Sequence, residues 1–182
     1  MGTQRMRLLA DYNRLMNARQ YAVCARLDVE ALNADCGAFF GSVLGTLNHL
    51  LVGDLLWLGR FSRHEAGLPL HDALSSMPRP QALDECLYPV FEALVPVRRH
   101  LDDVLCDWCA SLGEADLELP LHYENTRGEP FVRLLGDLLL HLFLHQVHHR
   151  GQVTTLLSQA GVDFGETDLV EIVPNLSDGL RG

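Results

Sequence analysis

The segment 136–161, GDLLLHLFLHQVHHRGQVTTLLSQAG, constrains the fold more than any other part of the chain. It places four histidines within nine residues, and its apolar residues recur with the spacing of an amphipathic helix that ends at the last glycine. Residues four apart lie on one face of a helix, so His141, His145 and His149 form a single stripe. His148 is rotated by about 100° from His149. The fold must therefore pack a histidine-bearing helix face against a neighbour.

Two of these histidines are the first candidates for metal ligands. Imidazoles at positions i and i+4 can both reach one cation at about 2.0–2.1 Å, which predicts a pair formed by His145 and His149. His145 and His148, an i, i+3 pair, are the geometric alternative. For each histidine alone, a buried ring with one hydrogen-bonded nitrogen is the competing interpretation. Two imidazoles alone hold a metal weakly. A third ligand from elsewhere in the chain would therefore favour a metal site over histidines that are simply buried in the core.

The segment 39–61 supplies that third candidate. Its apolar content predicts a second helix, and His49 stands among apolar residues within TLNHLLVGDLLWLGRF. A helix that packs at about 8–10 Å from the histidine-rich helix can bring one imidazole to the same point. The sequence therefore predicts a metal site formed by His49, His145 and His149.

Four nearby polar residues have open roles. Gln152 lies one turn after His149 and is a candidate to orient a ligand, and Asp54 is a candidate partner for the distal nitrogen of an imidazole. Ordinary helix polarity or a buried hydrogen bond is the alternative for both. His141 is expected to line a pocket one turn above His145, and His148 to contact a neighbour on its own helix.

The rest of the chain predicts two further long helices, over residues 3–27 and 83–112, the second beginning late or kinking because of Pro89 and Pro96. Residues 62–81 are expected to form a loop. The alternation in residues 116–123 predicts a short strand or hairpin, with Pro130 in the first turn of the last helix.

Three glycines, Gly37, Gly41 and Gly45, recur at four-residue intervals. They suggest a helix face that a neighbouring helix or ligand approaches closely, an irregular helix start being the alternative.

Length and charge limit the function. At 182 residues the chain can bury about 70% of its unfolded surface, so we expect one domain, residues 1–182, that folds without a disulfide or a metal. A bound metal is then functional. The net charge of −10 and the scattered arginines argue against a nucleic-acid partner.

Cellular location follows from the terminus and the cysteines. The N-terminal sequence MGTQRMRLLADYN lacks the apolar core of a signal peptide, and no segment reaches about 18 uninterrupted apolar residues, so we expect a cytoplasmic protein without a membrane partner. The five cysteines are an odd number, which favours reduced thiols. Cys106 and Cys109 form a CxxC pair within a helical pattern, which does not suit a redox motif.

Three features follow one another along the chain: a lone histidine followed by Asp54 and Trp57, then TRGEPF, then HLFLHQVHHRGQ. In this order of elements the chain resembles the DinB-like four-helix bundles over nearly its whole length. The resemblance implies an all-α, antiparallel bundle with long crossover loops. It also implies a divalent metal held by His49, His145 and His149. Several relatives are thiol-dependent S-transferases or isomerases, and the usual habit of the family implies a homodimer, which the glycine row and surplus apolar surface also favour.

Three classes of function stay open at this point. The metal is expected to be zinc or nickel, with iron or manganese as alternatives. Three neutral imidazoles do not reduce its positive charge. The ion can therefore act on a small-molecule substrate such as a low-molecular-weight thiol. That chemistry predicts a metal-dependent enzyme, either a thiol-dependent S-transferase or a hydrolase. A non-catalytic, stress-associated metal-binding protein is the second class, and a structural bundle with hydrogen-bonded core histidines is the third. A site open to small molecules favours the enzyme, and a fourth protein ligand favours binding without turnover.

Overall fold

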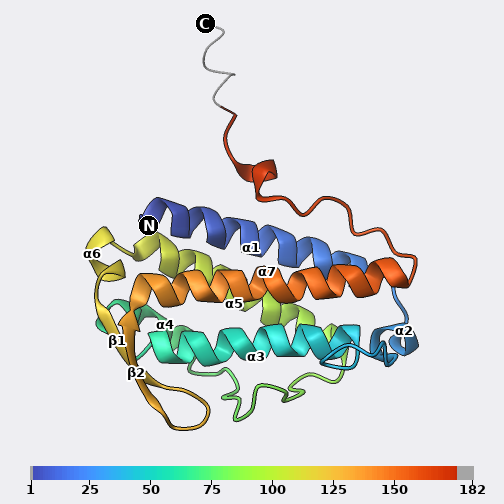
Figure 1. The fold of residues 1–182 in the computed structure, drawn as a ribbon, viewed down its shortest axis with the longest axis horizontal. Coiled ribbons are helices and arrows are strands. Elements are labelled where there is room, and N and C mark those ends of the chain that lie inside the picture. The colour runs from blue at the N-terminus through green and yellow to red at the C-terminus, as the bar shows by residue number, and fades with distance from the viewer. Residues whose placement is uncertain (1, 176–182) are drawn as a thin grey trace, which may run out of the picture.

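A computed structural model describes residues 2–175, which form a bundle of four long helices (Figure 1). These helices are α1 (Thr3–Cys24), α3 (Val43–Phe61), α5 (Phe91–Ser111) and α7 (Leu135–Gln159). Helices α1 and α5 pack as one antiparallel pair and α3 and α7 as another, while α1 also contacts α7. The crossover 62–90 carries the chain back between α3 and α5, which run in the same direction (Figure 1). The predicted all-α bundle is confirmed.

The shorter elements connect and cover the bundle. They are α2 (Val29–Asn33), η1 (Glu65–Gly67), α4 (Leu68–Ala73), α6 (Glu114–Leu117) and η2 (Leu169–Ile172). Strands β1 (Pro120–Glu124) and β2 (Pro130–Leu134) form an antiparallel hairpin, in which Pro120 pairs with Leu134 and Glu124 with Pro130. The short hairpin predicted before the last helix is therefore confirmed.

Helix α3 begins four residues later than the sequence suggested. Ser42 ends the preceding loop, and its Oγ accepts a hydrogen bond from the backbone N–H of Gly45 at 3.0 Å, which is an N-cap. Gly37 and Gly41 lie before this cap with φ of +65° and +75°, a region that favours glycine. The interpretation of these glycines as a close-approach helix face was therefore wrong, and the irregular start is what the structure shows.

Two other boundaries differ from the expected ones. Residues 62–81 are not simply a loop, because they include η1 and α4, with Leu70 only 1% exposed in the core. Pro130 lies at the start of β2 and not in the first turn of the last helix. Helix α5 begins late, at Phe91 after Pro89, as expected, and Pro96 is accommodated inside it.

The interior contains a polar cluster as well as an apolar core. Arg98 Nη1 donates to Asp54 Oδ2 at 2.6 Å, and Arg98 Nη2 lies 3.0 Å from Asp102 Oδ1. Asn17 donates to Asp102 at 2.9 Å and accepts from Arg150 Nη1 at 3.2 Å. We call these five residues the buried ion network. It connects all four long helices, and its two arginines balance its two aspartates.

Candidate metal centre

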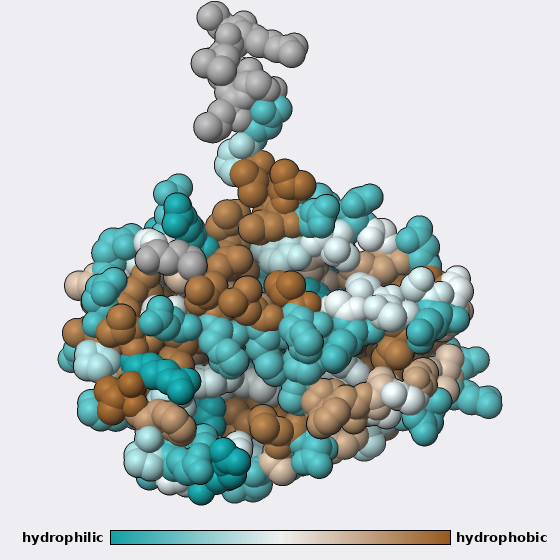
Figure 2. All heavy atoms as spheres, viewed as in Figure 1, coloured by the Kyte–Doolittle hydropathy of each residue, from teal (hydrophilic) through white to brown (hydrophobic). Residues whose placement is uncertain are grey.

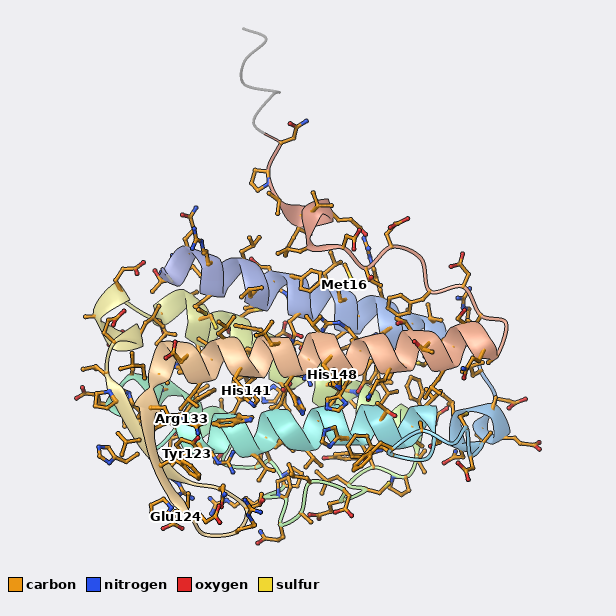
Figure 3. All side chains as sticks on the ribbon, in the orientation of Figure 1. Met16, Tyr123, Glu124, Arg133, His141 and His148 are labelled. Carbon is orange, nitrogen blue, oxygen red and sulfur yellow. The ribbon has the colours of Figure 1, made fainter. Side chains whose placement is uncertain are left out.

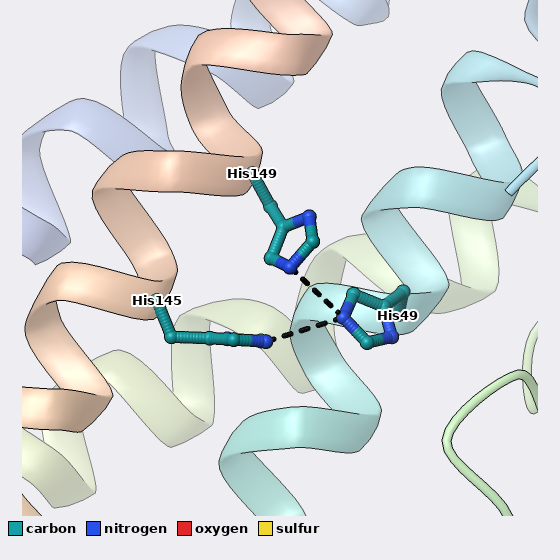
Figure 4. Close-up of side chains that lie close together, drawn as sticks. All are labelled: His49, His145 and His149. Atoms are coloured by element: carbon teal, nitrogen blue, oxygen red, sulfur yellow. Dashed lines mark hydrogen bonds between the residues drawn. The ribbon is translucent and has the colours of Figure 1, made fainter. Parts of the chain in front are cut away.

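Three imidazoles meet between α3 and α7. His49 Nε2 lies 3.2 Å from His145 Nε2 and 3.1 Å from His149 Nε2 (Figure 4). One nitrogen from each ring lies within 4.8 Å of the other two. His49 is buried, whereas His145 and His149 are half-buried. The structure thus brings together the three histidines that the sequence singled out.

Gly53 allows the two helices to approach at this point. It lies one turn after His49 on α3, opposite His145 on the antiparallel α7. A Cβ at position 53 would lie 2.8 Å from His145 Cε1, closer than real Cβ contacts. Sequence reasoning missed this glycine, although its position four residues after His49 placed it on the same helix face.

The distal nitrogens of two rings fix which nitrogen carries a proton. His49 Nδ1–H donates to the backbone carbonyl of Leu83 at 2.8 Å, and His149 Nδ1–H donates to Gln152 Oε1 at 2.8 Å. A neutral imidazole has only one N–H, so the Nε2 atoms of both rings are lone-pair acceptors. Two acceptors 3.1 Å apart cannot hydrogen-bond to each other, and a cation between them would satisfy both.

The spacing of these nitrogens fits a metal. Ligands at about 2.05 Å in a tetrahedral arrangement lie about 3.3 Å apart. The observed separations of 3.1 and 3.2 Å are within tenths of an ångström of that value. The nitrogens of His145 and His149 lie within 4.8 Å of each other, so small side-chain rotations would let all three nitrogens share one ion.

All three rings favour the neutral, metal-binding form. Burial lowers the pKa of His49 and of His149. Burial, followed by the repulsion that His149 and His49 would exert on a charged ring, lowers the pKa of His145 to about 3. Lone pairs are therefore available for a cation at neutral pH.

Of the neighbouring polar residues, some contact the histidine cluster and others form hydrogen bonds elsewhere in the bundle. Gln152 contacts the site, because its oxygen accepts from His149 and its amide donates to His148 Nε2 at 3.4 Å. His148 is outside the cluster. Asp54 does not contact an imidazole and instead pairs with Arg98, so its proposed role as an imidazole partner was wrong. The partner of the distal nitrogen of His49 is the backbone carbonyl of Leu83. Sequence reasoning could not find it, because no sequence pattern marks a carbonyl oxygen as a partner.

The surroundings of the cluster differ between its two sides. The ring of Phe40 stacks on His49 with centroids 3.8 Å apart. Towards the hairpin, His141 is exposed and its ring lies 6.1 Å from that of His145. In the described part of the chain no fourth histidine, cysteine or carboxylate joins the cluster.

Convergent neutral imidazoles from two facing helices place the chain among the helical bundles with a candidate metal centre. The DinB family matches residues 1–173, and the chain belongs to this family. It is also similar to Protein DinB of Bacillus subtilis (strain 168), with 28% identity over 169 residues that cover 88% of each chain. No solved structure matches the chain. Among residues 2–175, none of the helices combines the length and the apolar composition that a membrane span requires.

Proposed function

We propose that His49, His145 and His149 hold one divalent metal ion and that the site is a metal-dependent enzyme centre of the thiol-dependent S-transferase type. The observation that carries this proposal is the pair of Nε2 lone pairs 3.1 Å apart, whose rings already use their only N–H elsewhere. In a core that serves only the fold, polar atoms that face each other are paired as donor and acceptor, whereas these two Nε2 atoms are both acceptors. The donor set therefore fits a cation.

A divalent ion held by three neutral ligands keeps its full charge and lowers the pKa of a thiol or water that binds to it. The residues of the chain orient and shield the centre. Leu83 and Gln152 hold two rings in one tautomer, and Phe40 covers His49. In a transfer, the thiol sulfur bonds to an electrophilic carbon, the leaving group departs with the electron pair, and the thiol proton passes to solvent.

The three-ligand donor set supports an enzyme over a non-catalytic, stress-associated metal-binding protein. A purely binding site would be closed by a fourth protein ligand, and none joins the three histidines within residues 2–175. The same open position would suit hydrolysis, which is the alternative reaction. Zinc and nickel are the proposed metals, since imidazole suits both, with iron and manganese as alternatives.

Assembly and location complete the proposal. We propose a single domain over residues 1–182 that forms a homodimer in the cytoplasm. Figure 2 shows hydrophobic side chains on both sides of a polar band across this face of the molecule. On α7, Leu144 is 58% and Val147 is 41% exposed, which is apolar surface that a second copy could cover. All five cysteines are free thiols, which suits a reducing compartment. Light scattering at micromolar concentration tests the dimer, and a monomer mass would contradict it.

Cobalt substitution tests the chemistry. Addition of glutathione to the cobalt protein is expected to produce a sulfur-to-cobalt absorption band, because the open position admits an external thiol. Acetate serves as a comparison ligand with oxygen donors only. If acetate changes the cobalt spectrum and no thiol does, the transferase proposal fails and metal-assisted hydrolysis becomes the better account.

A further inference from the structure

Aromatic rings continue from the three histidines towards the hairpin. His141 lies one turn before His145, and its ring centroid is 5.2 Å from that of Trp57. Trp57 in turn lies 5.4 Å from Tyr123 of β1, and Tyr123 lies 5.6 Å from Phe131 of β2. Figure 3 shows His141 between α3 and α7 and Tyr123 at the hairpin. The row therefore joins the candidate metal centre to the β1–β2 hairpin.

Two arginines lie on the far end of this row. The Arg60 guanidinium is 4.5 Å from the Trp57 ring and 5.4 Å from the Tyr123 ring. Arg133, on β2, lies 4.9 Å from the Phe131 ring (Figure 3). Each guanidinium thus lies over an aromatic face, an arrangement that leaves N–H groups available to donate to a ligand.

These arginines have no acidic partner. Throughout residues 2–175, neither Arg60 nor Arg133 has a carboxylate within ion-pair distance, although the chain has 24 acidic and 14 basic residues. Arg60 is also half-buried, so its charge is partly desolvated without a carboxylate to offset it. After burial, the groups that lower the pKa of His141 are Arg133 and Arg60. This end of the α3–α7 interface therefore has a local positive potential in an acidic protein.

We propose that Arg60 and Arg133, stacked on Trp57, Tyr123 and Phe131, bind an anionic group of the ligand whose other end faces the three histidines. The inference rests on the proposed function, because it treats the histidine cluster as the reacting end. Guanidinium edges recognise carboxylate, phosphate or sulfonate oxygens through paired hydrogen bonds. Between the two ends, the exposed His141 and the half-buried Trp57 suit an apolar or planar linker.

The helix spacing sets the length of this ligand. Trp57 lies about 12 Å along α3 from His49, at about 1.5 Å of rise per residue. Arg60 stacks back over Trp57, so its guanidinium does not add to that distance. The ligand class is therefore an elongated anion, with its charge up to about 12 Å from its reacting end. A thiol that carries carboxylates, such as glutathione, belongs to this class.

The first test compares glutathione with its diethyl ester, which has the same thiol but no carboxylate. In the cobalt protein, the ester is expected to bind about tenfold more weakly, because it loses one charge-assisted pair of hydrogen bonds. Arg60→Gln should reduce glutathione affinity by about the same factor and remove the difference between the two ligands. Arg63→Gln is the matched control, because it makes the same change in net charge three residues away. It should leave both the glutathione affinity and the difference between the two ligands unchanged.

The hairpin offers a second matched pair of variants. Arg133→Gln is expected to weaken glutathione binding, whereas Arg127→Gln should not, because Arg127 already pairs with Glu129 at 3.2 Å. Equal affinities for glutathione and its ester in the unmodified protein would overturn the anion site and leave the thiol chemistry intact. Equal losses in Arg60→Gln and Arg63→Gln would also overturn it.

A second measurement does not depend on a thiol. In the zinc-loaded protein, sulfate at constant ionic strength should shift the indole N–H resonance of Trp57 in a saturable way, and Arg60→Gln should abolish the shift. Trp108, whose indole donates to the Ala66 carbonyl at 2.7 Å, is the internal reference. If sulfate shifts Trp57 but glutathione gives no cobalt band, the anion site stands and the thiol proposal fails. No saturable shift would contradict the anion site.

Discussion

The histidine cluster and the buried ion network are two polar regions inside one bundle, and they differ in what completes them. In the network, two arginines and two aspartates on three helices neutralise one another, with Asn17 of α1 as an additional partner. In the cluster, three rings converge on one point, and the Nε2 lone pairs of His49 and His149 have no counter-charge there. The network has its counter-charges within the chain, whereas the cluster requires a cation from outside. Polar burial alone therefore does not indicate function.

The largest expected effect is in the network. Arg98→Met leaves Asp54 and Asp102 buried without their shared cation, so we expect it to lower the free energy of unfolding by about 3–5 kcal/mol. Urea denaturation of the metal-free protein measures the change. Arg99→Met, at the exposed next residue, should stay within about 0.5 kcal/mol. A loss below about 1 kcal/mol in Arg98→Met would show that the network does not stabilise the fold.

The next effect separates neighbouring histidines in the cluster. His149→Ala removes a proposed ligand and should weaken metal binding by at least about 100-fold, whereas His148→Ala should leave it largely unchanged. Competition with a chelator measures both affinities. Equal losses would place the site on another helix face, and the reverse order would move it to His145 and His148.

Two glycines of α3 test the close helix approach. Gly53→Ala forces a Cβ against His145 and should reduce metal affinity by about tenfold. Gly59→Ala meets nothing within 4 Å, so it should leave metal binding unchanged and raise helix stability by up to about 1 kcal/mol. Unchanged metal affinity in Gly53→Ala would mean that the His145 ring can move aside without consequence.

The two regions should respond to pH in opposite directions, which is the smallest effect. The pKa of His145 falls to about 3 in the folded state, so its contribution to stability is present above pH 6.5 and is lost as the pH falls towards 3. Burial raises the pKa of Asp102 to about 6, so its contribution is present below pH 3.8 and is lost as the pH rises through 6.

Two variants separate these slopes in the metal-free protein. His145→Gln should make stability fall less steeply between pH 6.5 and 4, and Asp102→Asn should make it fall more steeply over the same range. Urea titrations at each pH provide the measurement. A steeper fall in His145→Gln would show that burial does not keep this ring neutral.

The comparison also explains how much could be predicted from sequence. The four-residue spacing of His145 and His149 is local, and His49 is conspicuous in an apolar helix, so the cluster could be found without coordinates. Arg98 lies 44 residues from Asp54, and nothing in either segment indicates that they pair. The late start of α3 depended on the Ser42 cap, which competes with an apolar pattern that continues through Phe39 and Phe40.

Metal content tests the central claim most directly. Protein purified without chelator, or reconstituted with zinc or nickel and then desalted, is expected to carry about one divalent ion per chain by elemental analysis. The variant with His49, His145 and His149 all replaced by alanine should carry none while it remains folded by circular dichroism. An absence of bound metal in the unmodified protein under both conditions would contradict the account, as would undiminished metal in the triple variant.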